Sequence, residues 1–483
     1  MIAIGNFEPD RTIFAPDATS NVINCLPVRD GWGPMPDVSV ISTALGTACL
    51  GAVYIRTAAG AYRIIAGTAT ALYEFDSATL GWTDRTRLVG GAYAVPAGDN
   101  WSFLPFGLNL LAANITDDIQ FLDIGSGTNF AALAGSPPKC KYLATAGEHL
   151  LMAHLASFPN RVQLSGIGDA TYHTIGSRGA DFQDFAEGEE IVGAIGAERG
   201  AVIIHRTVIR QLVLTSGGDY SFTTSIINPS RGSVAPLSIA SIGPGRFVYY
   251  SSDGFMLGFE GTPIGLERVD RWFASQVTGT NIFLIQSMVD PYQKIVWFKG
   301  IRSDNTGFMV GYDWALDRWC YSDAAIELMA ALVTPGVTID GMDVYYSTFD
   351  DASEPFDSRL FTGGSPTMAV FDTSHRLCYL TGGARAATLQ TPDMQLNSGG
   401  RAFLREARVI GDAGVDFTLK AITADYHGGT RTTGSAVTPY STTAICHFRS
   451  SALTHAFLME IPAGAAWNHV IGVEPIAIPE GDR

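Results

Sequence analysis

The stretch Asn281–Asp323, NIFLIQSMVDPYQKIVWFKGIRSDNTGFMVGYDWALDRWCYSD, gives the clearest indication of the fold. It contains four short apolar runs separated by glycine, proline, asparagine and aspartate, which are residues that favour turns. The runs show almost no 3.6-residue periodicity, so we expect strands and not helices. Four short strands joined by tight turns have the size of one blade of a β-propeller.

The same grouping recurs from about residue 48 to residue 372. Groups of runs begin near residues 49, 101, 140, 189, 236, 282 and 327, so successive starts lie 39 to 52 residues apart. A period of this size indicates a repeat architecture with one propeller blade per repeat. The repeat is degenerate, and its seventh group contains a longer excursion around Phe349–Ser358. The sequence therefore predicts an all-β protein with a propeller of six or seven blades.

A smaller signature repeats within the groups. Phe75-Asp76 is followed by Trp82, and Tyr312-Asp313 is followed at the same spacing by Trp319. The aspartate suits a tight turn, and the two aromatic residues can pack across the hairpin that it closes. Asp253-Gly254 predicts a further hairpin turn.

The segments on either side of the repeats differ from them. Residues 1–47 are rich in proline and turns, and we expect an irregular segment that packs on a propeller spanning residues 48–383. Residues 384–483 contain alternating stretches, such as apolar Val415, Phe417 and Leu419 between polar neighbours. Such alternation is typical of half-buried strands, so this part is expected to be a separate β-sandwich-like module.

The composition excludes several classes of protein. The 483 residues include 31 basic and 47 acidic ones, which gives a net charge of −16, and 46% are apolar. This balance argues against binding nucleic acid through a broad basic face. Neither a signal peptide nor a bilayer-spanning run of about 20 apolar residues is expected. The six cysteines are far apart, which favours reduced, buried thiols; they are Cys25, Cys49, Cys140, Cys320, Cys378 and Cys446.

Common catalytic motifs are missing from the sequence. It has no P-loop, no H-E-x-x-H, no G-x-S-x-G and no EF-hand loop. Three weaker groups of residues suggest a possible site. The histidines would form a metal site, the glutamates a pair of glycosidase carboxylates, and the arginines a phosphate contact. These groups are His149, His154, His173 and His205; Glu187, Glu189 and Glu190; and Arg199, Arg206 and Arg210.

Each of these groups also has a simpler explanation. Scattered histidines rarely converge, the glutamates suit a solvated loop, and arginines in an acidic chain pair readily with carboxylates. Arg206 and Arg210 have an even spacing, which would place them on one side of a strand. We therefore predict that the protein is not an enzyme and has no catalytic, cofactor-binding or metal-binding residues.

Three segments together resemble a known family. They are NVINCLPVRDGWGPMP (Asn21–Pro36), AVIIHRTVIRQLVLTSGG (Ala201–Gly218) leading to RGSVAPLSIASIGPGRFVYYSSDGF (Arg231–Phe255), and LQTPDMQL…FLREARVIGD (Leu389–Asp412). Their order is similar to that of the packaged-DNA stabilisation, or tail-nozzle (tail hub), proteins of short-tailed bacteriophages. The similarity extends over nearly the whole chain.

The resemblance implies a structural protein of the virion tail, assembled in the bacterial host cytoplasm. Such proteins form a homohexameric ring below the portal and its head-to-tail adaptor. They extend the DNA channel, retain the packaged genome and anchor the tail needle, fibres or spikes. Duplex DNA would pass without sequence-specific binding, and an acidic lining would let it slide.

Two alternatives from other classes remain open. One is a propeller tail protein that binds or degrades glycans of the host polysaccharide. The other is a monomeric propeller scaffold of a cell.

Overall fold

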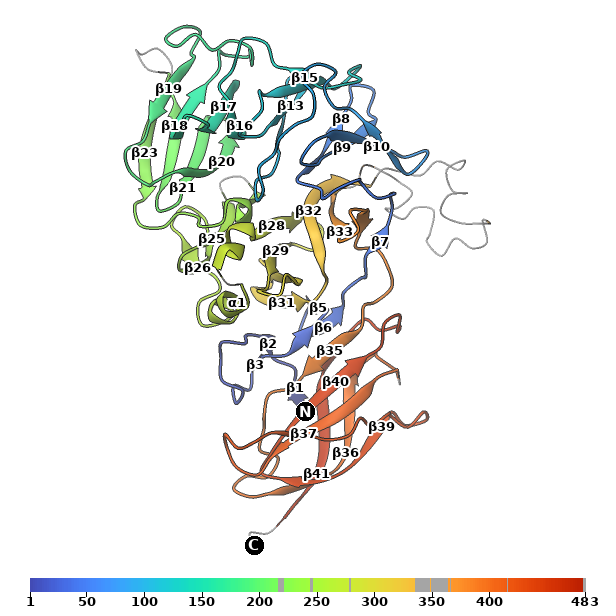
Figure 1. The fold of residues 1–483 in the computed structure, drawn as a ribbon. Helices are drawn as coiled ribbons and strands as arrows, with labels where there is room; N and C mark the ends of the chain where they lie inside the picture. The colour runs from blue at the N-terminus through green and yellow to red at the C-terminus, as the bar shows by residue number, and fades with distance from the viewer. Residues whose placement is uncertain are drawn as a thin grey trace.

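The computed structural model describes residues 1–215, 221–243, 246–277, 279–334, 348, 364, 366–414 and 416–480. Within these ranges the regular elements are almost all strands, with one short helix, α1 (Asp270–Gln276), and two 3-10 turns, η1 (Pro236–Ser238) and η2 (Gly279–Leu284). A propeller forms one end of the molecule and a β-sandwich forms the other (Figure 1). The predicted excursion at Phe349–Ser358 and Val415 lie outside the described residues. No helix in the described ranges is long and apolar enough to cross a membrane.

The propeller has seven blades, each a sheet of four antiparallel strands. Blade 1 contains β8 (Ala52–Arg56), β9 (Tyr62–Gly67), β10 (Leu72–Asp76) and β11 (Gly81–Asp84). Blade 2 contains β12 (Ser102–Phe106), β13 (Asn109–Ala113), β14 (Gln120–Asp123) and β15 (Ala131–Ala132). Blade 3 contains β16 (Cys140–Ala146), β17 (His149–Leu155), β18 (Phe158–Leu164) and β19 (Asp181–Asp184). Blade 4 contains β20 (Ile191–Ala197), β21 (Gly200–His205), β22 (Ile209–Leu214) and β23 (Phe222–Asn228).

The remaining blades follow the same order. Blade 5 contains β24 (Ala240–Gly243), β25 (Arg246–Ser251), β26 (Gly254–Leu257) and β27 (Thr262–Pro263). Blade 6 contains β28 (Gln286–Asp290), β29 (Ile295–Ile301), β30 (Gly307–Asp313) and β31 (Arg318–Ser322). Blade 7 contains β32 (Ile326–Val333), β33 (Pro366–Asp372), β34 (Leu377–Tyr379) and β7 (Ser39–Val40). A single bridge between Ala146 and Ala197 joins blades 3 and 4 into one eight-stranded sheet.

The ring is closed by the N-terminal segment. The first strands of the blades contact one another around the ring, with η1 touching both β20 and β25, and β32 returns to β8. The outermost strand of blade 7 is β7, which precedes blade 1 in the sequence and pairs with β34 in the register Val40↔Cys378. The first and last blades are thus tied together by one segment. The sequence predicted six or seven blades, and the structure has seven.

The predicted hairpin signature is confirmed. Phe75 lies opposite Trp82 with ring centroids 5.5 Å apart, and Tyr312 lies opposite Trp319 at 5.0 Å. The Asp76 carboxylate accepts a hydrogen bond from the Ala78 amide at 2.9 Å, which closes the turn. The predicted turn at Asp253-Gly254 also forms, because the last residue of β25 pairs with the first residue of β26, in the register Ser251↔Gly254.

The C-terminal module is a sandwich of two sheets. One has the order β39 (Ile445–Ala452), β36 (Ala402–Gly411), β41 (Val470–Pro479), β6 (Gly31–Pro34) and β5 (Cys25–Val28), with β1 (Ile2–Ala3) also paired to β41. The other has the order β38 (Thr432–Thr433), β37 (Thr418–Ala424), β40 (Thr454–Ile461), β35 (Ala387–Gln390) and β4 (Val22–Ile23). The sheets pack through contacts such as Phe448 on Phe457, with centroids 6.2 Å apart.

Residues 1–47 are not the irregular segment that the sequence predicted. They provide β1 and β4–β6 to the sandwich and β7 to the propeller, and β2 (Asn6–Phe7) pairs with β3 (Ala18–Thr19). These strands are two to four residues long, so their sequences carry no measurable alternation. The same segment packs on the propeller, because β2, β4 and β5 all contact β31 of blade 6.

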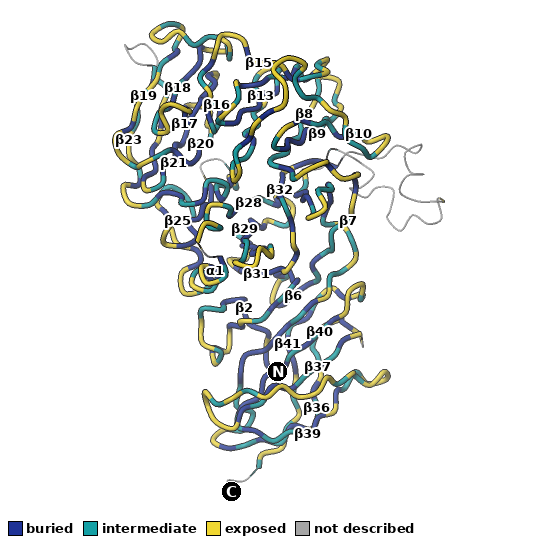
Figure 2. Tube along the Cα trace, in the orientation of Figure 1, coloured by how far each residue is buried: buried dark blue, intermediate teal, exposed yellow. Residues whose placement is uncertain are grey.

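The two domains share one hydrophobic core. Fully buried Trp297 and Trp319 of blade 6 belong to the same cluster as Trp32 of the N-terminal segment and Phe457 of the sandwich. Figure 2 shows buried residues running from the propeller into β6 and β41. Polar contacts reinforce this junction. Asn24 donates to the Ala386 carbonyl at 2.9 Å and accepts from the Ser322 hydroxyl at 2.8 Å, so one side chain links the sandwich to blade 6.

Substitution of the two hairpin tryptophans should have unequal effects. Trp319 is 1% exposed inside the shared core, whereas Trp82 is partly exposed in blade 1. We expect Trp319→Ala to lower the free energy of unfolding by about 3–5 kcal/mol, and Trp82→Ala by less than half of that. Urea denaturation followed by far-UV circular dichroism measures both. Equal losses would contradict the placement of Trp319 in a core that spans both domains.

Candidate functional site

A cavity of about 750 Å³ is lined by the first strands of four propeller blades, which contact one another around the ring. Its walls come from β12, β16, β20 and β28, from the loop 97–101, and from η1 and η2. We call it the axial cavity. Ligand sites in propellers and other closed scaffolds tend to occupy such a concave position, so the cavity is the first candidate for a site.

Three aromatic side chains line the axial cavity. Trp101 is 6% exposed and donates its indole N–H to the Thr68 carbonyl at 2.8 Å. It packs so closely on Gly67 that a Cβ atom there would lie 2.4 Å from the indole ring. Tyr142 lies edge-on to His154, with ring centroids 6.0 Å apart, and burial raises the pKa of its hydroxyl. Phe283 is 44% exposed and carries the Arg206 guanidinium 5.2 Å above its ring.

The charged residues of the axial cavity are paired with one another. Lys141 of β16 forms an ion pair with Asp99, and Arg206 forms one with Glu190. Arg206 also lies 3.5 Å from the Glu189 carboxylate. The carboxylates at this cavity are therefore neutralised by neighbouring cations, unlike the free acid and base that hydrolysis of a glycoside requires.

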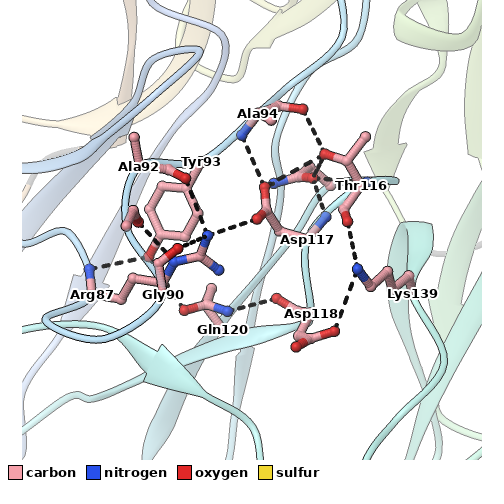
Figure 3. A network of polar contacts seen from close by, with 12 residues as sticks. Arg87, Gly90, Ala92, Tyr93, Ala94, Thr116, Asp117, Asp118, Gln120 and Lys139 are labelled. Carbon is pink, nitrogen blue, oxygen red and sulfur yellow. Dashed lines mark hydrogen bonds and ion pairs between the residues drawn. The ribbon is translucent and has the colours of Figure 1, made fainter.

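A polar network holds the connection between blades 1 and 2, a few residues before the loop 97–101 that lines the axial cavity (Figure 3). Asp117 accepts hydrogen bonds from the Arg87 guanidinium at 2.8 Å and from the Ala94 amide at 3.0 Å. The Arg87 guanidinium also lies 4.5 Å from the centre of the Tyr93 ring, and Lys139 donates to the Thr116 carbonyl at 2.7 Å. These contacts tie the connection between blades 1 and 2 to the turn between β13 and β14.

The four histidines that the sequence singled out do not converge. His149 and His154 lie near opposite ends of β17, and their Nδ1 atoms donate hydrogen bonds to the carbonyls of Ser165 and Ile191, at 2.6 and 2.7 Å, respectively. His173 lies in the loop between β18 and β19, and His205 lies in β21. Nowhere in the described ranges do three or more His, Cys, Asp or Glu side chains gather as metal ligands.

The acidic and basic groups singled out by the sequence neutralise one another. Arg210 lies 3.2 Å from the Glu187 carboxylate, and Arg206 pairs with Glu189 and Glu190. The prediction that even spacing places both arginines on one side of a strand is wrong, because β21 ends at His205 and Arg210 belongs to the next strand. Arg199 lies in the turn at the other end of β21. Pairing with carboxylates, the simpler of the two explanations, describes Arg206 and Arg210.

Sequence reasoning did not find most of the axial cavity. Asp99, Lys141, Tyr142 and Phe283 come from connections and strands of different blades. None of them lies in a local motif, and the closest signal was Arg206 beside the acidic residues 187–190. The six cysteines are free and buried, as predicted, and burial raises the pKa of the Cys446 thiol to about 11.

The lining of the axial cavity combines aromatic and charged side chains. Its aromatic faces and paired charges can hold a ligand with both apolar and polar parts. Ser102 accepts a hydrogen bond from the Leu143 amide at 3.0 Å, and within the described residues no histidine ring forms a hydrogen bond with its hydroxyl. A nucleophile held by a base is the geometry expected of acyl or glycosyl transfer, and the described side chains of this cavity do not form one.

Comparisons with known proteins find solved structures that are similar only at low sequence identity. No protein-family model matches the sequence, and no curated protein matches it. The structure is similar to BamB from Moraxella catarrhalis at 9% identity and a TM-score of 0.38, over 74% of this chain and 92% of that one. It is also similar to a chain of the mitotic checkpoint complex, at 9% identity and a TM-score of 0.36, over 73% of this chain and 95% of that one. A third similar structure is the computationally designed protein Ika8, at 9% identity and a TM-score of 0.37, over 64% of this chain and 90% of that one.

His205 gives a prediction about pH. Its ring is fully buried against Phe185, and burial lowers its pKa to about 4. The unfolded chain therefore binds a proton near pH 6.5 that the folded chain resists, so stability falls as the pH drops from 6.5 towards 4. The free energy of unfolding should fall between pH 7 and pH 5, and we expect this fall to be about 2 kcal/mol smaller in His205→Asn than in the unmodified protein.

Urea denaturation at the two pH values measures this difference. His447→Asn, at an exposed position of the sandwich, serves as the control for replacing a histidine. An unchanged pH dependence in His205→Asn would show that this ring is not held neutral by the fold.

Proposed function

We propose that this protein is a structural component of a bacteriophage tail, a nozzle or hub that forms a homohexameric ring below the head-to-tail adaptor. In this role it extends the DNA channel, retains the packaged genome and anchors the needle, fibres or spikes. The protein acts in the virion tail after assembly in the bacterial cytoplasm. It has no enzymatic activity and no cofactor.

The observation that supports this proposal most is the way in which the two domains are joined. A tail wall has to transmit force without its domains separating. Here the N-terminal segment contributes strands to both domains, and a single core runs between them. A ligand-binding propeller does not need such a junction, since its domains are usually joined by a linker with few contacts.

The distribution of charge supports the same role. Residues 48–383 contain 33 acidic and 21 basic residues, whereas residues 384–483 contain 9 acidic and 8 basic residues. An acidic wall repels the phosphate backbone, so DNA slides past it without becoming bound. The axial cavity of about 750 Å³ is too small for a duplex, so the proposed channel runs through the centre of the ring and not through a propeller.

The glycan-binding tail protein is the second candidate, and the axial cavity is the observation that favours it. Trp101, Tyr142 and Phe283 offer apolar faces beside the polar side chains of Asp99 and Asn100. Sugar rings stack on such faces while their hydroxyl groups bond to carboxylates and amides. The glycan-degrading form of this candidate lacks support, because Asp99 and Glu190 are each held in an ion pair.

Cryo-electron microscopy of intact particles and of particles lacking this chain tests the proposal. We expect six copies in a closed ring that is docked end-on to the adaptor ring. Particles without the chain should package DNA and then lose it. Density in peripheral trimers would favour the glycan-binding candidate. Density in the capsid shell, or stable genomes in its absence, would contradict a nozzle.

A further inference from the structure

One face of the sandwich combines exposed arginine and isoleucine side chains. β36 is flanked by β39 and β41, and its residues alternate between the core and solvent. Leu404 and Ala407 are fully buried, whereas Arg405 and Arg408 are exposed. The face therefore points away from the second sheet of the sandwich.

The strand register places these exposed residues next to one another. Arg408 lies opposite Ile445 of β39 and Glu474 of β41, and Glu406 lies opposite Ile476. Ile476 and Ile478 are 40% and 46% exposed. We call this surface the arginine–isoleucine face, and it consists of Arg405, Arg408, Ile445, Arg449, Ile476 and Ile478.

The three arginines of this face have no partner in the described part of the chain. Other arginines of the same domain are paired: Arg401 with Asp425 at 2.8 Å, and Arg431 with Asp393 at 2.6 Å. The side chains of Arg405, Arg408 and Arg449 form neither an ion pair nor a hydrogen bond with any described residue. Two carboxylates share the face, and one of them, Glu406, lies 3.8 Å from His447.

We propose that the arginine–isoleucine face docks on the acidic propeller of a second copy of this chain. Arginine beside exposed apolar side chains is the composition of protein interfaces. The propeller has 12 more acidic than basic residues, while the sandwich is nearly balanced, so the complementary surface lies in the other domain.

The chain cannot cover this face with its own propeller. The strands β36, β39 and β41 lie at the end of the molecule that carries the C-terminus, away from the blades (Figure 1). A contact between sandwich and propeller must therefore join different copies through different surfaces. Such a heterologous contact generates a ring when the rotation closes. The closure of this contact into a ring rests on the proposed function, whereas the contact between sandwich and propeller does not.

Nucleic acid is a poorer match for the arginine–isoleucine face. Exposed isoleucines gain nothing from phosphates, and the carboxylates of Glu406 and Glu474 would repel them. A protein surface can use both parts of the face at once, the arginines for its carboxylates and the isoleucines for its apolar side chains.

Photo-crosslinking of the full chain tests the inference. A benzophenone amino acid replaces Ile476, and the labelled chain is mixed with an isotopically heavy, unlabelled copy at high concentration and low salt. We expect mass spectrometry to find cross-links from position 476 to peptides of residues 48–383 of the heavy copy. Cross-links only within the sandwich, or none between copies, would overturn the inference.

Charge reversal provides the matched comparison. Arg405→Glu, Arg408→Glu and Arg449→Glu combined should reduce the cross-link yield about tenfold or more. The control reverses Arg199, Arg246 and Arg271, three exposed arginines whose side chains form no ion pair or hydrogen bond with a described residue. This control makes the propeller more acidic and should not reduce the yield. Equal yields from both triple variants, or binding of a DNA duplex that the first variant loses, would count against the inference.

The outcomes separate this inference from the proposed function. Closed rings on particles, assembled equally well by the Arg405, Arg408 and Arg449 variant, would leave the nozzle in place and remove this interface. Sandwich-to-propeller cross-links in open filaments would keep the interface and remove the nozzle.

Discussion

The sharing of residues 1–40 between two domains is the constraint on which the rest of the structure depends. Ser42 accepts a hydrogen bond from the Leu377 amide, 335 residues away, next to the β7–β34 pair that closes the ring. A few residues earlier, β5 and β6 complete a sandwich sheet against β41. Neither domain has its full set of strands until this segment lies between them. Closing such long loops costs entropy and slows folding, and the large shared core offsets that cost.

The same constraint determines what the surface can do. Because Trp32 stacks under the Arg318 guanidinium at 4.5 Å and Asn24 bonds to both domains, the sandwich is held firmly on blade 6. A rigid arm keeps the arginine–isoleucine face at a constant angle to the propeller. Repeated contacts at a constant angle are what allow an assembly to close. The charged side chains of the axial cavity, by contrast, form ion pairs with one another within the chain.

The sequence was informative wherever the structure is local. Most blades are built from strands that are neighbours in the sequence, so the groups of runs predicted a propeller of six or seven blades, and pairs such as Tyr312 and Trp319 predicted individual hairpins. It failed where partners are distant. Two-residue strands such as β4 and β7 show no periodicity, and their partners lie hundreds of residues away. The axial cavity was missed for the same reason, since Asp99, Lys141 and Phe283 meet only when the ring closes. The even spacing of Arg206 and Arg210 misled because a hairpin turn lies between them.

Hydrogen exchange measured by mass spectrometry tests most directly whether propeller and sandwich form one cooperative unit. Peptides covering β5, β31 and β41 represent the N-terminal segment, blade 6 and the sandwich. The shared core predicts that all three open with the same free energy, and that Trp32→Ala lowers that free energy equally in all of them. Exchange of β41 at a clearly lower free energy, with β31 still protected and unaffected by the substitution, would show two independent domains and contradict this account.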